Sequence, residues 1–177
     1  MKTALLATVV LFLCGAAEAA PLFSPVENDF SVAFVTAGQV APPSATEKAI
    51  GAFRQYETEQ GGETFVVTVD SYPASFKAPA ATQDTYQRLS WAHAQEAHAA
   101  LVSEGPAMLS GRAGWEGTYR TSAGGTEIRR ILMVGNRIYQ LSDTAAQPGA
   151  HAEEFFESFR IAPWALARWQ EPAKSAS

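Results

Sequence analysis

Residues Gly111–Leu141 read GRAGWEGTYRTSAGGTEIRRILMVGNRIYQL, and this stretch indicates three strands joined by two tight turns. Gly124-Gly125 and Gly135-Asn136 supply the positive φ that tight turns require. Each pair separates runs rich in Ile, Val, Thr, Tyr and Trp. The pattern predicts a three-strand antiparallel meander. The meander is a scaffold without a catalytic signature, so this stretch alone does not reveal a function.

Strand pairing determines which side chains of the meander share a face. The two-residue loop at Gly135-Asn136 places Leu132 opposite Tyr139. Two or four loop residues in the other hairpin pair Tyr119 with Arg130 or with Ile128, and both registers have the same parity. We therefore expect one apolar, aromatic face with a single guanidinium, formed by Trp115, Tyr119, Ile128, Arg130, Leu132, Tyr139 and Leu141.

A second hairpin is predicted nearer the N-terminus. Phe30–Val35 alternates large apolar with small residues, which is typical of a half-buried strand, and Pro42-Pro43 then forces an extended break. Ile50–Gln60 and Glu63–Tyr72 flank Gly61-Gly62, a two-residue hairpin turn. The expected register places Arg54, Tyr56 and Thr58 on one face beside Phe65, Val67 and Val69.

Two segments carry helical patterns. Residues 81–102 place apolar or weakly polar side chains three and four apart, with Thr82-Gln83-Asp84 as the expected start and Gly105-Pro106 as the stop. A shorter helix is expected over Ala150–Phe159, after which the chain can return to the sheet. The buried face of the long helix is Tyr86, Leu89, His93, Ala97 and Ala100, and that of the short helix is Phe155, Phe156 and Phe159.

These elements predict an α+β fold. We expect a mostly antiparallel β-sheet of about six strands, a hairpin plus a three-strand meander, with one long central helix on its aromatic face and a shorter C-terminal helix. The single domain spans residues 20–162. Residues 163–177 form a tail that ends in a polar run and is expected to be partly disordered.

The first nineteen residues have the pattern of a secretory signal peptide. Lys2 provides the basic start, Ala4–Leu13 the apolar run, and Ala17-Glu18-Ala19 the small-x-small cleavage site. The run is too short to span a bilayer, so we expect an exported, soluble protein in the periplasm or outside the cell. A lipoprotein anchored at Cys14 is the alternative, although Leu13 is larger than a lipobox favours.

Charge and cysteine content exclude several classes of function. The formal net charge is −5 and the basic residues are not clustered beyond Arg129-Arg130, which makes nucleic acid an unfavourable partner. Cys14 is the only cysteine, so cleavage after Ala19 leaves a mature chain that must fold without a disulfide.

The order of segments resembles that of a known group of proteins. The segments FSVAF, Pro-Pro, a hairpin ending in VDSYP, a helix, GRAGWEG, IRRILMVGNRIYQL and FFESFRI are similar to those of exported bacterial proteins of unassigned function. The fold of that group resembles the α/β/α sandwich of the photosystem-associated PsbP proteins and the Mog Ran-binding proteins. The resemblance covers nearly the whole mature chain. It implies a fold and transfers no functional residue, because no metal-site or Ran-contact motif is present.

Candidate catalytic and metal-binding patterns are weak. His93 and His98 in HAQEAH are five residues apart, about 140° around a helix, so they cannot converge on one metal ion. We expect a packed His93, a surface His98, no metal and no cofactor. The sequence shows no nucleophile elbow, and the mature chain has no cysteine nucleophile. Enzyme activity is not expected, although spacing alone cannot reveal a dispersed site.

Two sets of residues are candidates for binding. Trp115, Tyr119, Arg130 and Tyr139 either pack in the core or line a pocket for an anionic or planar ligand. Trp91, Trp164 and Trp169 are candidates for a protein interface, the alternative being that the tail folds back and buries its tryptophans. We predict a monomeric binding or accessory protein that contacts an unidentified envelope or periplasmic protein. A small-ligand binder or an unrecognised hydrolase is the alternative.

Overall fold

The structure is a computed structural model, and it describes residues 22–34, 44–48, 53–73, 79–147 and 149–170. Side chains are described for these residues except in 44–48 and 169–170. The predicted signal peptide, Cys14, the Pro42-Pro43 break and the end of the tail therefore lie outside the described residues.

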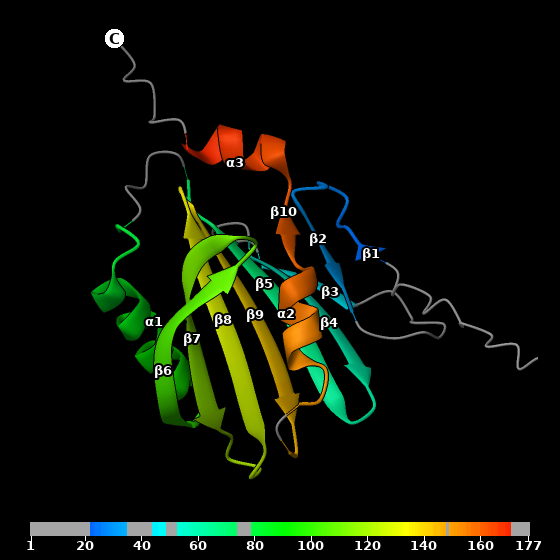
Figure 1. Cartoon of the computed structure of the whole chain (residues 1–177), viewed down its shortest axis with the longest axis vertical. Coiled ribbons are helices and arrows are strands. Elements are labelled where there is room, and N and C mark those ends of the chain that lie inside the picture. The colour runs from blue at the N-terminus through cyan, green and yellow to red at the C-terminus, as the bar shows by residue number, and fades with distance from the viewer. Residues whose placement is uncertain (1–21, 35–43, 49–52, 74–78, 148, 171–177) are drawn as a thin grey trace, which may run out of the picture.

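Seven antiparallel strands form the main sheet, in the order β3-β4-β5-β9-β8-β7-β6 (Figure 1). A smaller sheet has the order β1-β2-β10. The strands of the main sheet are β3 (Ser44–Lys48), β4 (Phe53–Gln60), β5 (Glu63–Ser71), β6 (Ala100–Leu109), β7 (Arg112–Arg120), β8 (Thr126–Val134) and β9 (Arg137–Ala145). The smaller sheet contains β1 (Leu22–Phe23), β2 (Phe30–Ala33) and β10 (Arg160–Ile161). The predicted α+β class is confirmed, and β1, β3 and β6 are strands that the sequence did not predict.

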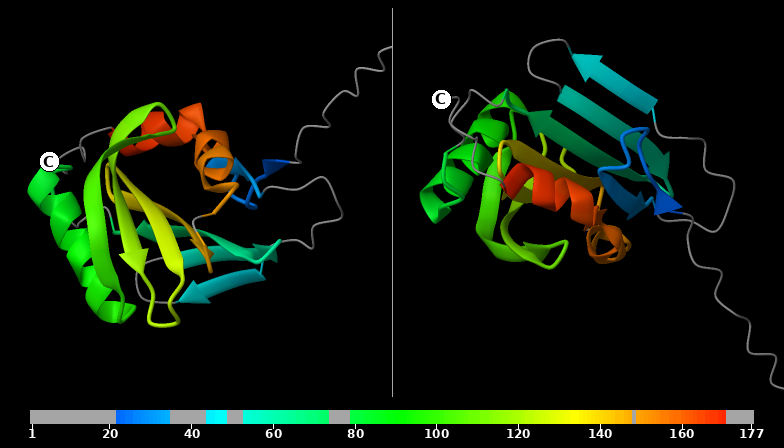
Figure 2. Two further views of the ribbon diagram at one scale, coloured as in Figure 1. Left: turned by 60° about the horizontal axis from the view of Figure 1, so that its bottom comes forward. Right: turned by 90° about the horizontal axis from the view of Figure 1, so that it is seen from above.

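Three helices complete the fold: α1 (Gln83–Glu96), α2 (Ala152–Ser158) and α3 (Pro163–Gln170). Figure 2 shows α1 on one side of the curved sheet, with α2, α3 and the smaller sheet on the other. The main core lies on the α2 side, where Phe155, Phe156 and Phe159 are almost fully buried as predicted. A second, smaller core lies under α1 and contains Tyr86, Trp115, Ile131, Met133 and Ile138.

Two of the predicted hairpins have the expected register. Gln60 pairs with Glu63 and Tyr56 with Val67, as a two-residue turn at Gly61-Gly62 requires. Leu132 pairs with Tyr139 around the Gly135-Asn136 turn. In both turns the first glycine has a positive φ, 60° at Gly61 and 58° at Gly135, the backbone conformation that favours glycine.

The register between β7 and β8 was predicted wrongly. Tyr119 pairs with Glu127, so the loop contains five residues, 121–125, and the parity shifts by one. Thr121 explains the longer loop. Its backbone N–H donates to the Gly125 carbonyl at 2.9 Å, and its hydroxyl accepts from the Gly125 N–H at 3.0 Å. These bonds tie the loop ends together outside the ladder, so Gly125 is not available for strand pairing.

The parity shift divides the predicted aromatic face between the two sides of the sheet. Trp115 pairs with Ile131, so Trp115 and Tyr119 lie on the side that α1 covers, whereas Leu132 and Tyr139 lie in the main core. The long helix therefore covers Trp115 and Tyr119 as predicted, but on β8 and β9 it packs on the face opposite to the predicted one. The tyrosine ring of Tyr119 covers Gly117, where a Cβ would lie 2.5 Å from its hydroxyl oxygen.

The long helix ends earlier than predicted. Thr82 caps its start as expected, but the helix stops at Glu96 and the chain turns into β6. His98 has a φ of 50° and donates to the Gln95 carbonyl, while the Ala99 N–H donates to the Ala94 carbonyl at 2.9 Å. This is a Schellman motif, which ends a helix at a left-handed residue. Glycine is the usual residue at that position, so a histidine there does not indicate a helix end.

The C-terminal segment also differs from the prediction. Pro163–Gln170 forms α3, and Ala165 of this helix is fully buried in the main core. Proline suits the first turn of a helix because its missing N–H has no intrahelical partner there. The tail therefore begins as a packed helix, and only its last part lies outside the described residues.

Candidate functional site

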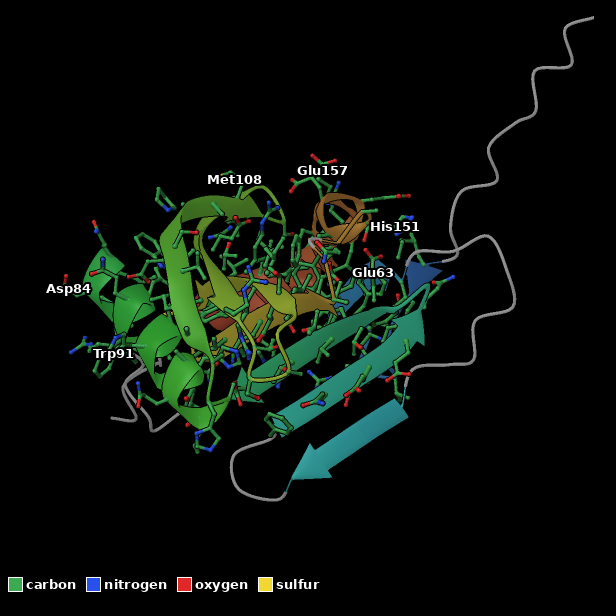
Figure 3. All side chains as sticks on the ribbon, turned by 90° about the horizontal axis from the view of Figure 1, so that it is seen from below. Glu63, Asp84, Trp91, Met108, His151 and Glu157 are labelled. Carbon is green, nitrogen blue, oxygen red and sulfur yellow. The ribbon has the colours of Figure 1, made fainter. Side chains whose placement is uncertain are left out.

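A groove of about 730 Å³ lies between the β6–β7 hairpin and α2. One wall comes from the hairpin, with Met108 as its large apolar side chain, and the other comes from α2, with Phe156 and Glu157. Figure 3 shows Met108 and Glu157 on facing elements across this part of the molecule. Arg130 of β8 lines the floor, and we therefore name this site the Arg130 groove.

Three contacts hold the Arg130 guanidinium in place. Its Nε donates to Glu116 at 2.7 Å, and its two Nη atoms donate to the Glu153 carboxylate at 3.2 and 2.6 Å. Its central carbon lies 4.6 Å from the centre of the Phe156 ring. Burial lowers the pKa of Arg130, but its hydrogen bonds to Glu116 and Glu153 outweigh burial and leave the pKa raised. The guanidinium is therefore permanently charged, and that charge is already balanced.

The side chains that line the groove carry more negative than positive charge. Three carboxylates, Glu116, Glu153 and Glu157, line it together with two guanidiniums, Arg130 and Arg160. Glu153 is 64% exposed at its side chain, whereas Arg130 is only 12% exposed. Glu153, Glu157 and Arg160 are exposed, whereas the central cation Arg130 is shielded. The lining thus carries a net charge of −1, which favours a cationic over an anionic group.

The apolar part of the lining adds contact area beside these charges. Met108 is 59% exposed, which is unusual for a large apolar side chain and suits an adaptable contact. The groove end is held by Ser110, whose hydroxyl accepts from the Ile161 N–H at 2.9 Å and so links the hairpin tip to β10. The hydroxyl is therefore engaged in a structural bond.

The first set of predicted binding residues is not brought together. Arg130 lines the groove, whereas Tyr139 is fully buried against Phe30 and Phe159. Trp115 stacks on Tyr86 beneath α1, and its ring N–H donates to Glu104 at 2.9 Å. Tyr119 is also fully buried on that side. Only Arg130 of the four is placed to meet a ligand in the groove.

The structure describes the side chains of two of the three tryptophans that were predicted to form a protein interface. Trp91 on α1 is 65% exposed and Trp164 on α3 is 47% exposed. These two tryptophans lie on two different helices, and the side chain of Trp169 lies outside the described part. A role for these tryptophans in partner binding stays a prediction.

His93 belongs to a polar cluster under α1. Its Nε2 lies 2.9 Å from a Glu127 carboxylate oxygen, and Arg129 donates to the other oxygen at 3.2 Å. Burial acts to raise the pKa of Glu127, but the contacts with His93 and Arg129 outweigh it and leave the pKa lowered. His93 is thus packed as expected, and His98 is exposed at the helix end.

The described residues contain no group of three or more His, Cys, Asp or Glu side chains placed to hold a metal ion. Their helices include none long and apolar enough to cross a membrane.

Most of the groove was not foreseen from the sequence. Glu153 and Glu157 were not among the candidate binding residues, and the strand that carries Met108 was not predicted. Glu116 is the one residue that a correct register would have found, because it lies directly opposite Arg130 and forms a cross-strand ion pair.

Comparisons with known proteins support the fold alone. No protein-family model matches the sequence, and no curated protein matches it either. Among solved structures, the chain is similar to the solution structure of cyanobacterial PsbP (CyanoP) from Synechocystis sp. PCC 6803, with a TM-score of 0.53. The two are 12% identical, and the match covers 86% of this chain and 99% of that one. The expected PsbP-like fold is confirmed, and the resemblance to Mog proteins stays a prediction.

Proposed function

We propose that this protein is an exported, non-enzymatic binding or accessory protein that acts through protein–protein contacts in the Arg130 groove. The partner segment carries a basic side chain next to an apolar one, and it belongs to a protein of the envelope or periplasm. The observation that supports this most directly is that three carboxylates line the groove against two guanidiniums, and that the charge of the central one, Arg130, is already balanced by Glu116 and Glu153. Export rests on the N-terminal sequence pattern.

The charges favour a cationic partner over an anionic one. Each acidic group of a ligand that approached Arg130 would have to displace Glu153, which makes two hydrogen bonds to the guanidinium. A Lys or Arg side chain instead meets Glu153 and Glu157 at the exposed rim without breaking those bonds. Met108 and Phe156 then provide apolar contacts on the two walls.

A small anionic ligand is the second candidate. The exposure of Glu153 favours it, because the carboxylate of a ligand can replace that of Glu153 when Glu153 turns to solvent. The Phe156 ring beside Arg130 would then support a planar group. This candidate requires the opposite charge preference, so one experiment separates the two.

The test compares the binding of fluorescent peptides of equal length that alternate Leu with Lys, Ser or Glu. We expect the Lys peptide to bind tightest to the full mature chain, and 0.5 M salt to weaken it because exposed charges are screened. Replacing Glu157 by Lys should weaken binding about tenfold or more, since like charges then face each other.

Glu154→Lys is the matched control. Glu154 is an exposed carboxylate on the same helix that does not line the groove. Its replacement should change the affinity less than about twofold. Equal loss in both variants would mean that only overall charge matters, and tightest binding of the Glu peptide would favour the anion-binding candidate. Absence of binding by every peptide would refute a peptide-binding groove.

A further inference from the structure

Asp143 on β9 is a buried carboxylate without a hydrogen-bond donor. Its side chain belongs to a residue that is only 1% exposed, and neither of its oxygens has a hydrogen-bond partner among the described residues. An ionised carboxylate in such a place loses its hydration without compensation. Asp143 therefore has a physical reason to hold a proton, and no contact in the groove or the cores accounts for it.

Glu63 is a second buried carboxylate at the same place. Phe65 pairs with Asp143 and Glu63 with Ala145, so the two acids lie on the same face of neighbouring strands. A side chain at Gly149 would collide with the carboxylates of both acids. The two groups thus converge beneath the backbone of the segment that leads into α2.

His151 connects this acid pair to α2. Its Nδ1 lies 2.6 Å from Glu63 Oε2, and Figure 3 shows the two residues side by side at the end of the helix. His151 is the N-cap residue of α2 and makes no capping bond with its side chain. Its carbonyl accepts the Phe155 N–H at 3.0 Å. The residue that begins the helix is therefore fixed to the sheet through Glu63.

The charged groups near this cluster come from each neighbouring element. They are Glu63 from β5, Asp143 from β9, and His151 and Glu154 from the α2 end. On the same face of β8, the nearest charge along the strand is Arg130, which is engaged by Glu116 and Glu153. The cluster thus carries a net negative charge when all of its carboxylates are ionised.

We infer that Glu63, Asp143 and His151 form a proton-operated latch that holds the first turn of α2 on the sheet in acid and loosens it as the pH rises. A protonated Asp143 can donate its O–H to Glu63, whereas two ionised carboxylates at this spot repel each other. A protonated His151 also strengthens its contact with Glu63. Both protons therefore act in the same direction.

The direction of the pH effect follows from the two titrating groups. Burial, reinforced by Glu63, raises the pKa of Asp143 to about 6. The hydrogen bond to Glu63 raises the pKa of His151 above its ordinary value. A group whose pKa is raised in the folded protein takes up protons on folding. Its contribution to stability is therefore complete in acid and is lost as the pH rises through the pKa that the group has in the folded protein. For Asp143 the loss therefore begins near pH 4, where an unfolded aspartate titrates, and is nearly complete just above pH 6, and for His151 it begins near its ordinary value of 6.5 and ends above it.

The latch would regulate the Arg130 groove, because α2 supplies one wall of it. That consequence depends on the function proposed above, whereas the motion of α2 does not. An experiment on the helix alone therefore distinguishes a failure of the latch from a failure of the groove.

Amide hydrogen exchange in the full mature chain measures the latch. After correction for the intrinsic exchange rate, the opening of the Phe155 amide should increase about tenfold or more between pH 5 and pH 8. Asp143→Asn keeps the shape of the side chain without its charge, and it should reduce the change to less than about threefold. Glu59→Gln, an exposed carboxylate on the neighbouring β4, is the control that should retain the full change.

A second measurement needs no variant. A carbon-13 NMR titration of the wild-type chain should show the Asp143 carboxyl titrating about two pH units above an ordinary aspartate, in agreement with its pKa near 6. An Asp143 carboxyl that titrates near pH 4, or an α2 opening that is equal at both pH values, would overturn the latch. A misfolded Asp143→Asn variant would leave this titration as the deciding result.

Discussion

Asp29 is fully buried and serves as the only carboxylate in contact with two guanidiniums among the described ion pairs. It lies 2.5 Å from Arg54 Nη2 and 2.6 Å from Arg137 Nη1, and it therefore joins the β2 end to two strands of the main sheet. Burial lowers the pKa of Arg54, but the hydrogen bond and the charge of Asp29 outweigh burial and raise it. Arg54 therefore stays ionised, and the stability of this corner depends on its pairing with Asp29.

Replacement of Asp29 by Ala should destabilise the protein by about 3 to 5 kcal/mol, because it leaves buried cationic charge unpaired. Urea unfolding at pH 7 measures the loss. Glu27→Ala is the control: Glu27 contacts the same guanidinium at 2.7 Å, but its side chain is 47% exposed. Its replacement should cost less than about 1 kcal/mol. Equal costs for the two variants would contradict a special role for the buried carboxylate.

At the scale of elements, tertiary contacts outweigh local sequence signals in β6 and α3. Pro106 lies inside β6, yet the strand forms because β6 is an edge strand of the main sheet, where a missing N–H breaks no ladder bond on the open side. Helix α3 has only eight residues and would be marginal in isolation. It persists because Ala165 and Leu166 pack against the main core.

A charge on the packed side of α3 should therefore detach the helix. We expect Ala165→Glu to lower the free energy of unfolding by about 2 kcal/mol or more, since the carboxylate cannot be buried unpaired. Ala167→Glu places the same charge on an exposed position of the same helix and should change stability by less than about 0.5 kcal/mol. Thermal unfolding of both variants checks the difference. Similar effects at the two positions would mean that α3 is not docked through Ala165.

At the scale of the whole molecule, one sheet separates two cores. Side chains that alternate along β8 and β9 supply both, so Ile131 and Ile138 pack under α1 while Leu132 and Leu141 pack against the α2 side. The sheet is thus covered on both faces along these strands, which makes them the centre of the fold. The two cores share backbone but no side-chain cluster.

Mutations in the two cores should therefore have additive effects. Ile138→Val in the smaller core and Ile161→Val in the main core should each cost about 0.5 to 1.5 kcal/mol. The double variant should equal the sum within about 0.5 kcal/mol, because the two residues lie on opposite faces and share no partner. Urea unfolding of the wild type, the two single variants and the double variant measures the coupling between the two positions. A coupling above about 1 kcal/mol would show that strain passes through the sheet.

Much of the fold could be predicted because its signals are local. Turn glycines with alternating strands determined two hairpin registers, and a capped apolar stripe determined the start of α1. The β7–β8 register could not be predicted in the same way. It depends on whether Thr121 bonds to Gly125, and a single added loop residue moves Trp115 and Tyr119 to the other face.

The sequence by itself determined the α+β class and the order of the strands in the meander, because propensity, periodicity and turn chemistry act over a few neighbouring residues. Only the tertiary structure decided which face each helix covers, and which distant groups meet. The Arg130 groove joins β6, β8 and α2, and the buried acid pair joins Glu63 to Asp143 across eighty residues of chain. Such long-range contacts depend on the number of residues in each loop, which determines the face on which a side chain lies, and on the loss of hydration of charges in the packed molecule. A local sequence pattern shows neither.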